Sequence, residues 1–128
     1  MRLSEAIRLG AMLKPRQAFG AWLDEDGGTC AIGAALDAFG ALNADGTADE
    51  QKWAEAVKCV RPTTFIPNAC PACFRTSDRV DDTMRHLNNH HRWTREQIAD
   101  WVESIERTLE APQSVAAADP GVSLTTTG

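Results

Sequence analysis

The apolar positions of this chain recur mainly at helical intervals. Near the N-terminus, Leu3, Ile7 and Ala11 are spaced by four residues, which places their side chains on one face of a helix. Ser4 is of a type that caps helices. The pattern therefore predicts a first helix over residues 5–13.

A second and a third helix are predicted further along the chain. Thr29 can cap a helix over residues 30–39, which is rich in small and apolar side chains. Thr47, followed three residues later by Glu50, forms a capping box that opens a third helix to about residue 59. Its apolar side carries Trp53, Ala56, Val57 and Val60.

Two more helices are predicted in the last third of the chain. The fourth starts at Ser77 or Asp78, and its apolar stripe consists of Val80, Met84, Leu87 and His91. Thr94, with a glutamine three residues later, forms a capping box that opens a fifth helix over 95–110. Its apolar face carries Ile98, Trp101, Val102, Ile105 and Leu109.

Strand signals are few and short. The best are residues 65–66 and 18–23, whereas residues 61–76 contain three prolines and predict a loop. Residues 111–128 have the composition of a disordered tail. We therefore expect one small, mainly α domain over residues 1–110, with about five helices and at most one short β-hairpin.

Charge is distributed unevenly along this chain of 128 residues and net charge −5. Residues 21–50 hold seven acids and no Lys or Arg, whereas residues 51–95 hold eight bases and four acids. An acidic protein is a poor general binder of nucleic acid, which depends on many phosphate contacts. A local basic face is still compatible with this charge distribution. Its candidates for phosphate contact are Arg75, Arg79 and Arg85, although nearby aspartates reduce the net positive charge there.

The chain contains neither a long apolar run nor a secretory signal pattern at its start. We therefore expect a cytoplasmic protein that does not enter membranes. Thiols stay reduced in the cytoplasm, which favours metal binding or free thiols over disulfides for the four cysteines.

The most specific motif combines two cysteines with histidines. Cys70 and Cys73 are followed by His86, and then by His90 and His91, in the pattern C-x2-C-x12-H-x3-H. Thiolate and imidazole at this spacing are typical of tetrahedral zinc sites. The sequence predicts a structural zinc site formed by the loop and helix at residues 70–91.

The sequence pattern allows either of two adjacent histidines, His90 or His91, to be the fourth ligand. In a regular helix His90 lies about 40° from His86 around the axis and His91 about 140°, which favours His90. If the last helical turn tightens or frays, His91 can reach the ion instead.

The predicted site does not form an independent zinc finger. Such fingers need large apolar residues at two positions that are Ser77 and Thr83 here. We therefore expect the metal to hold the loop against a larger helical core.

Other roles for the cysteines compete with this interpretation. Cys30 follows Gly27-Gly28-Thr29 at a predicted helix start, where a thiol could serve as a nucleophile, although nothing in the sequence brings a base to it. Cys70 and Cys73 could form a redox pair, but residues 68–69 do not have the strand pattern that such proteins place before the motif. Cys59 could replace a histidine ligand, or could simply be a small apolar residue.

The chain resembles a family of small bacterial and phage proteins. The stretches that carry the resemblance are Leu3-Ser4-Glu5-Ala6-Ile7-Arg8-Leu9-Gly10-Ala11, residues 28–36, Cys70-Pro71-Ala72-Cys73, and His86-Leu87-Asn88 through Trp93 to Trp101-Val102-Glu103. The resemblance implies that His91 is the fourth ligand. It also implies a prophage or mobile-element origin. It implies no enzymatic activity or mechanism for the chain.

Together these features predict a non-enzymatic interaction module that contains structural zinc bound by Cys70, Cys73, His86 and His91, with His90 as the alternate. Its expected partner is a protein, with nucleic acid as the weaker choice. The competing hypothesis is an enzyme that uses Cys30 or an open zinc site, or a thiol redox protein.

Overall fold

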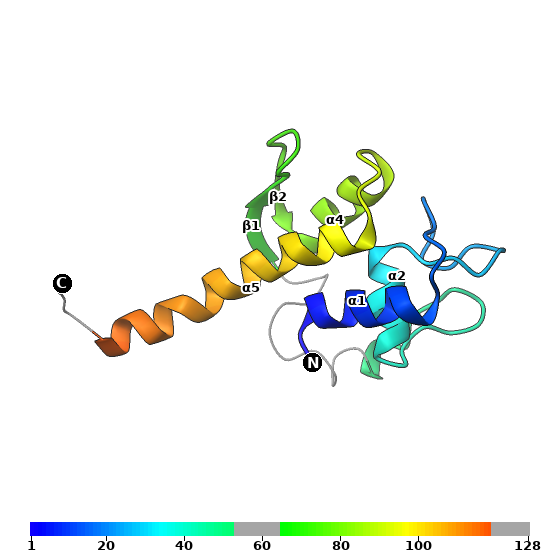
Figure 1. Ribbon diagram of the computed structural model, residues 1–128, viewed down its shortest axis with the longest axis horizontal. Coiled ribbons are helices and arrows are strands. Elements are labelled where there is room, and N and C mark those ends of the chain that lie inside the picture. The colour runs from blue at the N-terminus through cyan, green and yellow to red at the C-terminus, as the bar shows by residue number, and fades with distance from the viewer. Residues whose placement is uncertain (53–64, 119–128) are drawn as a thin grey trace.

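The computed structural model describes residues 1–52 and 65–118, with side chains up to residue 109 except Phe65. The elements are α1 (Leu3–Leu13), α2 (Ala31–Ala38), β1 (Phe65–Ala69), β2 (Thr76–Arg79), α4 (Val80–Asn89) and α5 (Arg95–Ala118). The described part combines these helices with one small antiparallel sheet, which is compatible with the expected mainly α domain (Figure 1). Most of the predicted third helix, including Cys59, lies outside the described residues.

Helix α5 lies between two groups of elements. The β1–β2 hairpin and α4 lie on one side of it and α1 on the other, while its C-terminal half extends away from the rest (Figure 1). Buried apolar side chains from α1, α2, α4 and α5 form one core. Its largest members are Leu3, Ile7, Met84, Leu87, Ile98, Val80 and Val102.

The loop before α2 is held by two buried polar side chains. The guanidinium of Arg95 donates to the carbonyl of Lys14 at 2.6 Å and to the hydroxyl of Thr29 at 2.9 Å. The amide of Asn88 donates to the carbonyl of Ala18 at 3.0 Å and accepts from the N–H of Ala31 at 3.3 Å. These contacts fix the loop against α4 and the start of α5.

Several helix starts differ from the predicted caps. Helix α1 begins at Leu3, and the Ser4 hydroxyl donates at 2.5 Å to the buried carboxyl group of Glu106 on α5. Helix α2 is capped by Cys30, whose sulfur accepts from the N–H of Gly33 at 3.4 Å, whereas the Thr29 hydroxyl accepts from Arg95. The cap side chain at the start of the third helix is Asp49, whose carboxylate accepts from the N–H of Lys52.

The predicted loop over residues 61–76 contains a strand. β1 covers residues 68–69, so the expectation that these residues are not a strand is wrong. β1 pairs with β2, which includes Ser77 and Asp78, and α4 consequently begins later, at Val80. Pairing of two short segments across a turn overrides their weak individual propensities.

Helix α5 is longer than predicted. It continues to Ala118, so residues 111–118 differ from the predicted disordered tail, and residues 119–128 lie outside the described part. Four of these eight residues are alanine, the strongest helix former. None of the helices described here is long and apolar enough to span a membrane.

Candidate metal centre

The cysteines lie in the turn that joins β1 to β2. Cys70 follows β1 directly, and its N–H donates to the carbonyl of Arg75 at 2.8 Å. Its carbonyl accepts from the N–H of Phe74 at 2.8 Å, and Phe74 has a positive φ of 66°. This tight turn places the sulfurs of Cys70 and Cys73 on the same side.

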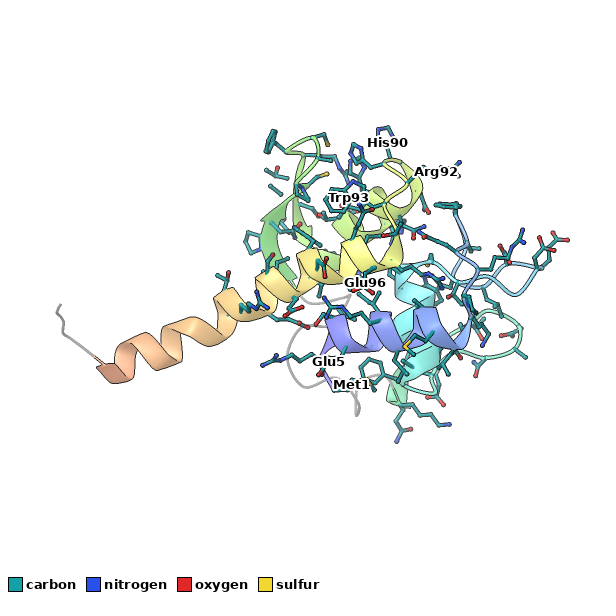
Figure 2. The ribbon with its side chains drawn as sticks, in the orientation of Figure 1. Met1, Glu5, His90, Arg92, Trp93 and Glu96 are labelled. Atoms are coloured by element: carbon teal, nitrogen blue, oxygen red, sulfur yellow. The ribbon has the colours of Figure 1, made fainter. Side chains whose placement is uncertain are left out.

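The histidines lie at the end of α4. The N–H groups of His90 and His91 both donate to the carbonyl of His86, at 2.9 and 3.3 Å, so the helix closes there. Arg92 then adopts a positive φ of 57°, which turns the chain towards α5. Figure 2 shows His90, Arg92 and Trp93 in this turn. The closure directs His91 towards His86 instead of along the apolar stripe.

Four side chains from these two segments converge. One ligand atom from each of Cys70, Cys73, His86 and His91 lies within 4.8 Å of all the others. The Nε2 atom of His86 is 3.3 Å from the sulfur of Cys73 and 3.1 Å from the Nε2 atom of His91. This cluster could hold a metal ion.

His90 lies outside the cluster. Its ring stacks on that of His86, with centroids 4.9 Å apart and planes inclined by 11°. The side chain is exposed to solvent. The structure thus places His91, not the alternate His90, among the four converging groups.

The electrostatics of the cluster suit metal ligation. Burial acts to raise the pKa of the Cys70 thiol, but N–H groups of the turn, including that of Ala72 at 3.4 Å, lower the pKa below its ordinary value. Burial is the largest cause that lowers the pKa of His86, and the positive charge of Arg75 adds to it. A thiolate and a neutral imidazole are the forms that bind metal.

The surroundings connect the cluster to the rest of the fold. Cys70 is fully buried and belongs to the hydrophobic core. The hydroxyl of Thr83 on α4 donates to the Asn68 side chain on β1, and the Ser77 hydroxyl donates to Asp82 at 2.9 Å. Sequence reasoning missed the contact between Thr83 and Asn68, since no local pattern links residues 15 apart.

Cys30 does not have the surroundings of a nucleophile. It lines a cavity of about 70 Å³, well below the roughly 300–1,000 Å³ of typical ligand sites. Burial raises the pKa of its thiol, which disfavours the reactive thiolate. The described residues that line this cavity include no histidine to act as a base.

The redox alternative also lacks its usual setting. Cys70 follows a strand, but it opens the turn of a hairpin instead of the N-terminus of a helix. Comparison of the chain with protein-family models, with curated proteins and with solved structures finds no match.

Proposed function

We propose that this chain is a small interaction module whose fold is stabilised by a structural zinc ion bound to Cys70, Cys73, His86 and His91. The observation that carries the proposal is the convergence of two thiols and two imidazoles from separate segments. Two sulfur and two nitrogen ligands are a common structural zinc set, and hard cations prefer oxygen.

The spacing of the ligand atoms supports zinc. Around a tetrahedral ion with Zn–S of about 2.3 Å and Zn–N of about 2.0 Å, neighbouring ligand atoms lie about 3.3–3.8 Å apart. The distances of 3.1 and 3.3 Å from His86 to its neighbours need only a small adjustment to fit, and the separations of up to 4.8 Å within the cluster would have to shorten by about 1 Å. Four protein ligands leave no open coordination position, which favours a structural role over a catalytic one.

The role of the zinc in this proposal is to hold the β1–β2 turn against the end of α4. An isolated two-stranded hairpin is marginal in water, and the turn after α4 contains a residue with positive φ, so both segments would gain from a cross-link. A metal cross-link offsets the entropy of ordering both. The proposal places the protein in a reducing compartment, where both thiols stay available.

The test is metal analysis of freshly reduced protein combined with thermal unfolding before and after chelation. We expect one equivalent of zinc and a clear fall in melting temperature once the zinc is removed. Cys73→Ser should lose the metal, and its matched control Cys30→Ser should keep it. Metal-free protein that unfolds at the same temperature with and without added zinc would refute the proposal.

A further inference from the structure

A continuous surface of arginines and aromatic rings lies beside the proposed zinc site. We call it the arginine–aromatic face, and it consists of Phe19, Trp22, Arg75, Arg85, Asn89 and Arg92. The face includes residues that line two neighbouring surface cavities. These cavities are continuous with each other, because Arg85 and Asn89 line both of them. Trp22 lines the first cavity, and Arg75 lines the second.

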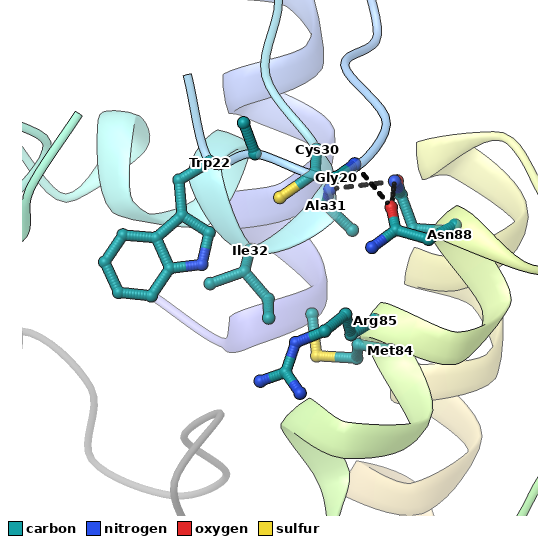
Figure 3. Close-up of a pocket in the computed structure, with 10 residues that line it drawn as sticks. Gly20, Trp22, Cys30, Ala31, Ile32, Met84, Arg85 and Asn88 are labelled. Atoms are coloured by element: carbon teal, nitrogen blue, oxygen red, sulfur yellow. Dashed lines mark hydrogen bonds between the residues drawn. The ribbon is translucent and has the colours of Figure 1, made fainter. Parts of the chain in front are cut away.

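The loop before α2 supplies the aromatic half of this face. The N–H of Gly20 donates to the Asn89 side chain at 2.9 Å, which holds the loop against α4. The guanidinium of Arg92 lies 4.3 Å from the centre of the Phe19 ring. Figure 3 shows the Trp22 indole and the Arg85 side chain on either side of Ile32.

Both aromatic rings remain substantially exposed. Phe19 is 44% exposed and Trp22 is 37% exposed, although both are large hydrophobic residues. Exposed aromatic rings interleaved with arginines provide faces on which planar groups can stack. The first cavity is too small to take in a base, so a base would stack over Trp22 at its rim.

Among the residues that the structure describes, Arg75 and Arg85 have long ion pairs. Arg75 is 3.5 Å from Asp82, and Arg85 is 3.6 Å from Asp82 and 3.9 Å from Asp81. Such exposed pairs contribute little and are readily exchanged for another anion. On the opposite side of α5, by contrast, Arg8 is held by three acids at 2.6–2.8 Å.

The acidic residues on α4 weaken this surface less than their number suggests. Asp81 is nearly buried, and its carboxylate is bound at 2.9 and 3.0 Å by the guanidinium of Arg79. Asp82 is the acid among the residues that line the second cavity. The sequence analysis expected nearby aspartates to dilute the basic charge, but the structure turns the carboxylate of Asp81 inwards.

We infer that the arginine–aromatic face binds single-stranded nucleic acid. Phosphates would contact Arg75, Arg85 and Arg92, and exposed bases would stack on Trp22 and Phe19. A long duplex fits less well, because its bases are already stacked and the molecule carries net negative charge elsewhere. The inference rests on the proposed function, since the zinc would fix the turns that present Arg75 and Arg92.

The test is fluorescence anisotropy with fluorescein-labelled dT15 and U15 and a labelled duplex of equal length. For the zinc-loaded protein we expect saturable binding of a single strand, weaker duplex binding, and affinity that falls steeply between about 50 mM and about 200 mM salt. Zinc content and circular dichroism of each sample report on the proposed function separately. Zinc-loaded, folded protein that binds neither single strand overturns the inference and leaves the proposed function standing.

Matched variants locate the binding surface. Arg85→Gln should weaken binding about fivefold and reduce the salt slope by about 0.7, as expected for one phosphate contact. Arg107→Gln on α5, with the same change of charge, should have almost no effect. Equal effects of Arg85→Gln and Arg107→Gln would overturn the assignment to this face.

The aromatic contribution is tested in the same way. Trp22→Ala should weaken binding about tenfold, and Trp22→Phe should restore most of it, since stacking needs a ring. Leu109→Ala is the control for an exposed apolar side chain away from this face. Wild-type affinity in Trp22→Ala, or equal loss in Trp22→Phe, contradicts the stacking role.

Discussion

At the scale of single residues, the structure separates two adjacent histidines. The N–H groups of both His90 and His91 bond to the His86 carbonyl, and this closure of α4 brings only His91 into the cluster. We expect His91→Ala to lose zinc and to lower the melting temperature as far as chelation does. His90→Ala should retain one equivalent of zinc, because its ring only stacks on His86. Metal analysis of the two variants checks this, and loss of zinc in both would point to a shared ligand position.

The buried thiol of Cys30 should make the free energy of unfolding fall at alkaline pH. Because burial raises its pKa in the folded protein, the unfolded chain releases this proton first, and unfolding becomes easier as pH rises above the ordinary thiol value of about 8.5. Urea unfolding at about pH 7.5 and about pH 9.5 should show a smaller loss of stability in Cys30→Ser than in the wild type, since serine does not titrate there. Identical losses in both proteins would show that the thiol is accessible to water.

At the scale of elements, the crossing of α1 and α2 depends on glycine. A Cβ atom on Gly10 would lie 1.8 Å from the carbonyl oxygen of Ala34, so the two helices could not keep their present contact. We expect Gly10→Ala to lower the free energy of unfolding by about 3 kcal/mol or more. Gly40→Ala is the control, because its site is open and only its positive φ of 71° is unfavourable, at about 1 kcal/mol. Equal unfolding free energies in urea for the two variants would contradict this close contact.

The elements also show how far the sequence could predict the fold. The positions of α1, α2 and α5 followed from apolar spacing, and the capping box of Thr94 and Gln97 is present with both of its hydrogen bonds. The caps at Ser4 and Thr29 were wrong, since α1 already begins at Leu3 and Cys30 caps α2, and the two hydroxyls bond to distant partners, Glu106 and Arg95. Local pattern predicts a helix, but it cannot identify a partner from another part of the chain.

The same distinction applies to the candidate metal site. Residue types and spacing predicted Cys70, Cys73 and His86 together with one of two adjacent histidines, because cysteine and histidine in this pattern are typical of a metal site. Spacing alone could not choose between His90 and His91, since the choice depends on the turn at Arg92, where φ is positive. Nor could the sequence join Trp22 and Arg85 into one surface, because loop contacts through Gly20 and Asn89 bring them together.

At the scale of the whole molecule, the proposed zinc and the hydrophobic core stabilise different parts. The contact between α1 and α2 and the packing of α5 on α1 involve no ligand, whereas the β1–β2 turn and the end of α4 contain all four. Cys70 is the ligand that belongs to both parts. Removal of the metal should therefore loosen the molecule unevenly.

Hydrogen exchange before and after chelation tests this division. We expect amide protection to fall in residues 70–75 and 86–93, where the ligands and the two turns with positive φ lie. Protection in α1 and α2 should change little, because their buried contacts do not involve the metal. Cys73→Ser, which removes an exposed ligand without disturbing the core, should reproduce the pattern of the chelated protein. Equal loss of protection in all helices would mean that the zinc controls folding of the entire domain, and an unchanged pattern would mean that the four side chains hold no metal.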